Sequence, residues 1–158
     1  VYGVILVIGA AAGSNSIYRP LQGLMSLAGS ALTDLQQLHF KRIKSLDDLH
    51  AELSHASAQE KPAMLDFYAD WCVVCKEMEE YTFSDIRVLL LLDKLVLLQA
   101  DVTENDDQDR ALLREFNIYG PPAIMFFGVD GRERLSHRVV GFMQADEFTI
   151  HIRDAIGQ

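Results

Sequence analysis

The chain has 158 residues, 49% of them apolar, which suffices for one domain with a buried core plus additional segments. Its formal net charge is −9 and no run of Lys or Arg offsets it, which argues against nucleic acid and anionic membrane surfaces as partners. Its two cysteines stand three positions apart, too few for a four-ligand zinc site and too close for their bridge to stabilise the fold. A redox pair is the remaining interpretation.

The first stretch, residues 1–13, is apolar and uncharged but shorter than the roughly 20 residues that span a bilayer. Three interpretations are open: the end of a transmembrane helix, a signal peptide without its front, and a buried core helix. The first two would place the rest of the chain outside the cytoplasm. Residues 14–37 contain Ser, Asn, Gly and Pro and predict a linker, while residues 38–158 carry the regular pattern of a folded domain.

The remaining elements are predicted from apolar periodicity and from capping and turn residues. In chain order they are a strand at 39–43, a helix capped by Ser45 and ending near 58, a strand at 62–69, helices at 72–81 and 85–92, a strand at 95–102, a helix at 106–116, strands at 123–129 and 134–141, and a helix at 146–156. This β-α-β-α-β-α-β-β-α order predicts an α/β fold with helices on both faces of a mixed sheet. The one hairpin, turning at Asp130-Gly131, supplies its antiparallel edge.

The two cysteines, Cys72 and Cys75, occupy the start of a predicted helix that follows an apolar strand. A helix N-terminus has unpaired N–H groups and a partial positive charge, so the thiolate of Cys72 is favoured there. Cys75 lies almost one turn further on and is predicted to be less exposed. This asymmetry predicts that Cys72 attacks a partner disulfide and that Cys75 resolves the mixed disulfide. The alternative is a pair of inert core cysteines.

Two carboxylates could act on this pair. Asp66 stands in the middle of an otherwise apolar predicted strand, where a charge is costly to bury without a partner or a task. Glu79 lies four residues after Cys75 and seven after Cys72, on the same predicted helical face. Behind the sulfurs, both carboxylates would raise the cysteine pKa by repulsion and relay a proton to or from Cys75. The alternatives are a hydrogen-bonded structural carboxylate at Asp66 and a solvated helix position at Glu79.

Three further residues are candidates for substrate docking. Pro121 and Pro122 precede the predicted strand at 123–129, and an X-Pro bond there is a natural site for a cis peptide. Facing the cysteines, a cis proline would offer its neighbouring backbone groups to a bound peptide as a short pairing edge. The alternative is an ordinary loop breaker. Trp71, in the loop before Cys72, is either a cap on the core or an exposed docking ring.

These residues together resemble thioredoxins. The resemblance consists of the strand at 61–69, the WCxxCK run at 71–76 and the Gly-x-Pro break at 120–122, and it covers roughly residues 38–156. It implies the thioredoxin fold and thiol-disulfide oxidoreductase activity, with neither a metal nor an organic cofactor.

The sequence is more similar still to one branch, the C-terminal domain of DsbD, the transmembrane thiol:disulfide interchange protein of the bacterial inner membrane. Residues 68–85 carry this resemblance, and the Tyr-Thr-Phe-Ser-Asp continuation at 81–85 is far more specific than CxxC alone. Gly-Phe-Met at 141–143 also looks like that family. Residues 1–24 look like the end of its last transmembrane helix and the linker after it, which favours the transmembrane interpretation.

The resemblance implies a role for each matching residue. Cys72 matches the attacking cysteine and Cys75 the resolving one, Asp66 and Glu79 match two acidic residues thought to tune the pair, and Pro122 matches the cis proline. The domain is implied to be a protein-disulfide reductase that faces the periplasm. It would take electrons from the transmembrane domain of the same protein and give them to the N-terminal periplasmic domain, which serves disulfide isomerases and cytochrome c maturation.

One departure from the family pattern lies at the proline pair. Pro121 and Ala123 flank Pro122, where the family often has an aliphatic residue and Thr. This difference is expected to alter the docking edge and to leave the chemistry intact. Two rival functions are open: a free-standing secreted thioredoxin-like oxidase or isomerase, and a non-catalytic thioredoxin-like binding module.

Overall fold

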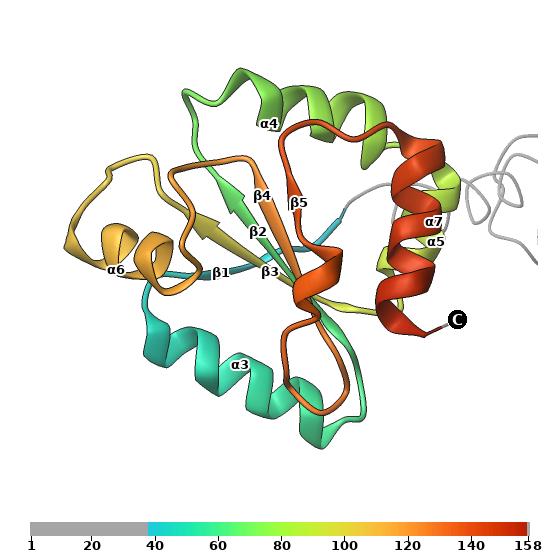
Figure 1. Ribbon diagram of the computed structural model, residues 1–158, viewed down its shortest axis with the longest axis horizontal. Helices are drawn as coiled ribbons and strands as arrows, with labels where there is room; N and C mark the ends of the chain where they lie inside the picture. Colours follow the sequence, from blue (N-terminus) through green and yellow to red (C-terminus); the bar gives the residue numbers. More distant parts are fainter. Residues whose placement is uncertain (1–37, 158) are drawn as a thin grey trace, which may run out of the picture. The chain divides into compact units, whose positions relative to one another are not determined.

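The computed structural model describes residues 38–157, in which five strands form one mixed sheet in the order β1-β3-β2-β4-β5 (Figure 1). The strands are β1 (Lys41–Ile43), β2 (Ala63–Tyr68), β3 (Val96–Asp101), β4 (Ala123–Phe127) and β5 (Val139–Val140). Strand β3 pairs in parallel with both β1 and β2, whereas β4 is antiparallel to β2 and to β5. The predicted α/β fold with a mixed sheet is therefore confirmed.

Helices cover both faces of this sheet. They are α3 (Leu46–Ala58), α4 (Val73–Glu77), the π-helical turn η1 (Met78–Thr82), α5 (Ile86–Leu92), α6 (Asp107–Glu115), the 3₁₀ turn η2 (Leu135–His137) and α7 (Ala145–Ile156). Helices α3 and α6 contribute to one apolar core, and η1, α5 and α7 contribute to a second core on the opposite face. The predicted cap of α3 is also confirmed, because Ser45 and Asp48 form a reciprocal capping box.

Strand β2 is the centre of the sheet, and all six of its residues are buried. Its side chains alternate between the two cores: Leu65 and Phe67 belong to the first and Met64 to the second. Such a buried strand is typically an uninterrupted apolar run, and the one charged residue in β2 is Asp66. At its carboxyl end β2 leads into a short loop, and the two cysteines follow at the start of α4. The central strand therefore positions the site.

The helix predicted at 72–81 differs from the observed one. Regular α-helix ends at Glu77 and continues as the wider π turn η1. Contacts with a distant segment account for the change: the Thr82 hydroxyl donates to the Met143 carbonyl at 2.6 Å, and the Met143 N–H lies 3.3 Å from the Met78 sulfur. These contacts hold the end of the active-site helix against the chain that leads into α7.

The prediction of a returning strand at 134–141 is wrong over most of its length. In this part of the chain, pairing with β4 is limited to β5 and to one isolated bridge between Phe127 and Glu133. Between them the chain turns through η2. Arg138 explains the interruption: its guanidinium donates to the Phe116 carbonyl at 2.6 Å and to the Glu133 carboxylate, which draws this segment away from the ladder.

The two N-terminal segments for which a transmembrane end and a linker are predicted, 1–13 and 14–37, lie outside the described residues. Within residues 38–157, no helix is both long enough and apolar enough to cross a bilayer.

Candidate active site

Cys72 and Cys75 are joined as a disulfide at the start of α4, with their Cα atoms 5.3 Å apart. Cys72 is the N-cap residue and has an extended backbone, and the N–H of Cys75 points at the Cys72 sulfur over 3.1 Å. A backbone N–H aimed at a sulfur stabilises that sulfur when it becomes a thiolate. The local geometry therefore favours negative charge on Cys72 once the pair is reduced.

The expected difference in exposure is absent from this disulfide form. Cys72 is 5% exposed and Cys75 is 4% exposed, so the prediction of a clearly more accessible first cysteine is wrong here. The two sulfurs differ instead in what they face. The Cys72 sulfur receives an N–H donor, whereas the Cys75 sulfur lies 4.0 Å from the carbonyl oxygen of Phe67, a group that does not stabilise a thiolate.

Asp66 is buried in the sheet, 6% exposed, one residue before Phe67. Its register partner on β3 is Gln99, whose side-chain amide donates to the Asp66 carboxylate at 2.8 Å. Burial raises the pKa of Asp66 from 3.8 to about 6; the Gln99 hydrogen bond opposes the rise and the charge of Glu79 adds to it. Asp66 is thus both hydrogen-bonded and poised to change protonation near neutral pH.

Sequence reasoning missed Gln99, although a signal existed. Gln99 is a polar residue within the apolar run of β3, and parallel pairing places it level with the one charged residue of β2. Two polar residues in the middle of neighbouring buried strands are expected to find each other.

Glu79 is exposed on η1, which agrees with the solvated-position alternative. It is nevertheless within electrostatic reach of the site, because its charge raises the pKa of both buried Asp66 and exposed Lys76. The structure therefore places the Asp66 carboxylate inside the sheet and Glu79 at the surface.

The docking candidates lie in two loops. Trp71 is 61% exposed, and its indole N–H donates to the carbonyl of Thr103 at 3.2 Å. The Pro121–Pro122 bond is cis, as predicted, and the Pro122 carbonyl already accepts a hydrogen bond from Gly141 at 3.1 Å. Because proline has no N–H, the backbone of this pair can only accept hydrogen bonds from a bound peptide.

A second polar group beside the disulfide was not predicted. The Lys76 ammonium donates to the Tyr68 hydroxyl and lies 4.7 Å from the centre of the Tyr68 ring, and that hydroxyl donates to the Asp70 carboxylate at 3.1 Å. These contacts link the end of β2 to the residue after Cys75, across the cysteine loop, residues 69–72, which joins β2 to α4.

Within residues 38–157, no group of three or more His, Cys, Asp or Glu side chains is arranged to hold a metal.

Comparisons with known proteins place this geometry in a family. A protein-family model described as thioredoxin-like matches residues 44–128, more than half of the chain. The oxidised C-terminal domain of DsbD from Neisseria meningitidis is 35% identical and superposes with a TM-score of 0.64, over 73% of this chain and 99% of that domain. The chain belongs to the thioredoxin-like family, among the C-terminal domains of DsbD.

Longer relatives agree with this assignment. DsbD of Ralstonia nicotianae is 45% identical over 98% of this chain, and DsbD of Escherichia coli K12 is 47% identical over 96% of it. Both are named thiol:disulfide interchange proteins, and the chain spans about a quarter of the length of each.

Thiol-disulfide interchange is therefore the chemistry of this DsbD-type module, and the Cys72–Cys75 disulfide is its redox-active group. The module is a thiol-disulfide oxidoreductase, and neither the free-standing secreted protein nor the non-catalytic binding module is favoured.

Proposed function

We propose that the module is a protein-disulfide reductase of the periplasm, in which Cys72 attacks the partner disulfide and Cys75 resolves the product. The observation that carries this proposal is the N–H of Cys75 directed at the Cys72 sulfur over 3.1 Å. Because it stabilises a thiolate on Cys72 and not on Cys75, it supports Cys72 as the nucleophile and as the better leaving group.

The reaction then follows from the reduced pair. The Cys72 thiolate attacks one sulfur of the partner disulfide, and the other partner sulfur leaves as a thiolate that takes up a proton. The thiol of Cys75 then loses its proton and its sulfur attacks Cys72 in the mixed disulfide, which re-forms the Cys72–Cys75 bond. The second partner sulfur leaves as a thiolate and takes up a proton to balance the one released by Cys75, so the partner is released as a dithiol. Two electrons pass to the partner, and the module ends in the disulfide form seen in the structure.

Asp66 is proposed to tune this sequence rather than to carry it out. Asp66 stands on β2 next to Phe67, whose carbonyl oxygen lies 4.0 Å from the Cys75 sulfur. With a pKa of about 6, Asp66 is mostly ionised at neutral pH, so its charge opposes formation of a thiolate on either cysteine. The exposed Glu79 is proposed to act in the same direction, weakened by solvent.

The partners are proposed from the relatives, of which this chain covers only a quarter. The electron donor is the transmembrane domain of the same protein and the acceptor its N-terminal periplasmic domain, with disulfide isomerases and cytochrome c maturation proteins served indirectly. The module would then face the periplasm from the inner membrane. The charge of −9 is consistent with protein partners rather than nucleic acid.

The test is electron transfer to the proposed acceptor. The reduced chain is mixed with the oxidised N-terminal domain of Escherichia coli DsbD, and thiol alkylation followed by mass spectrometry reports the redox state of both. The proposal predicts oxidation of Cys72 and Cys75 together with reduction of the acceptor, and no transfer from a Cys72→Ser variant. Exchange with small disulfides but not with this domain would contradict the partner assignment.

Equilibration with glutathione separates a reductase from the rival oxidase. A reductase is expected to have a potential below about −200 mV, whereas a strong oxidase lies near about −120 mV. A value at the oxidising end would contradict the proposed direction of electron flow.

A further inference from the structure

Thr103, in the loop between β3 and α6, makes two hydrogen bonds to the residues just before Cys72. Its hydroxyl accepts a hydrogen bond from the backbone N–H of Asp70 at 2.9 Å, and its carbonyl accepts one from the indole N–H of Trp71 at 3.2 Å. Asp70 and Trp71 are the two residues immediately before Cys72. One residue on a neighbouring loop therefore holds both the backbone and the aromatic ring that precede the attacking sulfur.

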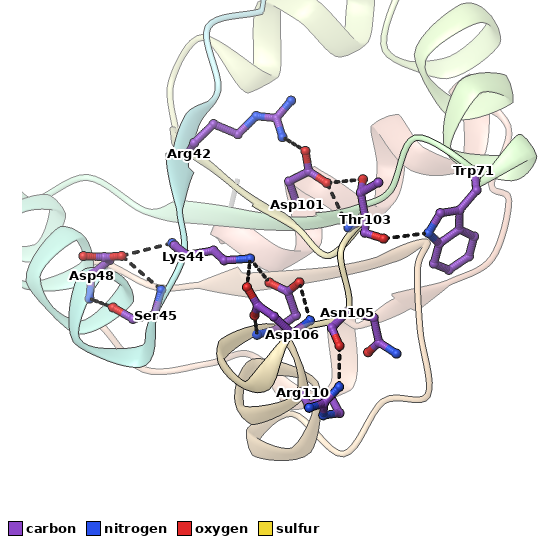
Figure 2. Close-up of polar contacts among 11 residues, drawn as sticks. Arg42, Lys44, Ser45, Asp48, Trp71, Asp101, Thr103, Asn105, Asp106 and Arg110 are labelled. Carbon is purple, nitrogen blue, oxygen red and sulfur yellow. Dashed lines mark hydrogen bonds and ion pairs between the residues drawn. The ribbon is translucent and has the colours of Figure 1, made fainter.

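Thr103 is itself fixed by hydrogen bonds to Asp101, the last residue of β3. The Asp101 carboxylate accepts hydrogen bonds from the N–H of Thr103 at 3.0 Å and from its hydroxyl. The other carboxylate oxygen of Asp101 accepts one from the Arg42 guanidinium at 2.5 Å. Figure 2 shows this chain of contacts running from Arg42 on β1 through Asp101 and Thr103 to the Trp71 ring. The Thr103 hydroxyl is thus used twice, as a donor to Asp101 and as an acceptor from Asp70.

The far end of the same loop is also fixed. Lys44, which follows β1, pairs with Asp106 at 2.8 Å and with the buried Asp109 at 2.6 Å, and Arg110 donates to the Asn105 carbonyl (Figure 2). Ion pairs and hydrogen bonds therefore bind the loop to β1 and α6 on both sides of Thr103. A loop held in this way is a rigid support and not a mobile flap.

Trp71 is largely exposed. The residue is 61% exposed and precedes Cys72, where a partner must approach. A large aromatic side chain gives a docking surface most when its orientation is fixed beforehand, because immobilising a free side chain on binding costs affinity.

We propose that Thr103 is a positioning residue for substrate docking, which fixes Trp71 and the backbone of Asp70 as one wall of the surface that receives a partner disulfide. The inference rests on the proposed reductase function but concerns how a protein substrate is held, not how its disulfide is cleaved. Its occupant is the protein chain on either side of that disulfide, which would lie against the Trp71 ring.

The test compares Thr103→Val with Thr103→Ser, which keeps the hydroxyl. Thr103→Val keeps the shape and the carbonyl that binds Trp71, but it removes the hydroxyl bonds to Asp101 and Asp70 that hold this carbonyl and the residue before Trp71 in place. Thr149→Val is the matched control, since Thr149 is a buried threonine on α7 whose hydroxyl donates to Ala145 at 2.7 Å. Two readouts are taken: insulin reduction with dithiothreitol as electron source, and time-resolved fluorescence anisotropy. Trp71 is the only tryptophan of the chain, so the anisotropy reports this ring alone.

Thr103→Val is expected to raise the KM for insulin about fivefold, with kcat changed by less than about twofold, and to increase the fast motion of the Trp71 ring. Thr103→Ser should restore both values, and Thr149→Val should change neither. Unchanged ring motion in Thr103→Val would overturn the inference whether or not the chain reduces insulin, which keeps its failure separate from that of the proposed function. A fall in kcat alone, or the same effects in Thr149→Val, would also overturn it.

Discussion

Replacing Asp66 with Asn should make the stability of the oxidised module less dependent on pH. Asp66 is buried in the central strand, and burial raises its pKa from 3.8 to about 6 despite the Gln99 hydrogen bond. Asn has nearly the same shape, and its amide oxygen can still accept the hydrogen bond from Gln99. The substitution therefore removes the buried charge while leaving the packing of β2 in place.

The sign and size follow from linkage between protonation and folding. The pKa is higher in the folded state, so the protonated carboxyl favours folding below pH 3.8, and this contribution is lost as pH rises through about 6. Because the pKa of Asp66 rises from 3.8 to about 6 on folding, its ionisation lowers the free energy of unfolding. Relative to the protonated form, this loss is about 3 kcal/mol at about pH 7.5, where it is fully expressed, and about 1 kcal/mol at about pH 4.5. When the pH is raised from about 4.5 to about 7.5, the free energy of unfolding of Asp66→Asn should therefore increase by about 2 kcal/mol relative to that of wild type.

The assay is urea unfolding of the oxidised chain at both pH values, where neither cysteine titrates because the disulfide is intact. Asp154→Asn is the control, because it removes one negative charge from an exposed position on α7. The control should follow wild type within about 0.5 kcal/mol at both pH values. An equal difference between Asp66→Asn and wild type at the two pH values would refute the raised pKa of Asp66.

Two further predictions concern charges near the site and at the edge of the sheet. In the reduced chain, Asp66→Asn and Glu79→Gln should each lower the pKa of the Cys72 thiol, with the larger effect from the buried residue and with non-additive effects in the double variant; thiolate absorbance against pH measures both. Lys44→Met should destabilise the fold by about 2 kcal/mol in urea unfolding, because it leaves the carboxylate of Asp109 buried without its cation. No loss of stability in Lys44→Met would mean that this ion pair contributes nothing, and unchanged Cys72 titration would return Asp66 to a structural role.

Features that depend on neighbouring residues in the chain could be predicted from the sequence. The capping box of Ser45 and Asp48, the cysteine pair at a helix start and the turn before β4 all follow from short-range patterns. The limits of β2 and β3 are also predicted within one residue at each end, because both are apolar runs bounded by polar or breaking residues.

Features that depend on distant contacts could not be predicted in this way. The π turn η1 depends on Met143, which lies 61 residues beyond Thr82, and the broken return strand depends on Arg138 reaching Phe116. Thr103, which lies 32 residues after Trp71, was missed for the same reason. Periodicity reports which face of an element is buried but not which distant loop will supply a hydrogen bond.

Cys75 is predicted to be less exposed than Cys72, and the two are nearly equally buried for another physical reason. Position at a helix start predicts an electrostatic difference between Cys72 and Cys75, which the N–H directed at Cys72 supports. It does not predict accessibility, which depends on how the surrounding loops pack, and both residues are nearly equally buried.

The most direct test of the central claim is the trapping of mixed disulfides by single cysteine variants. Cys75→Ser and Cys72→Ser are each incubated with a protein disulfide and examined by intact mass spectrometry under acid quench. If Cys72 is the attacking residue and Cys75 the resolving one, Cys75→Ser accumulates a covalent adduct with the partner and Cys72→Ser does not. An adduct on Cys72→Ser with none on Cys75→Ser would reverse the roles, and the absence of an adduct on either would contradict thiol-disulfide exchange by this pair.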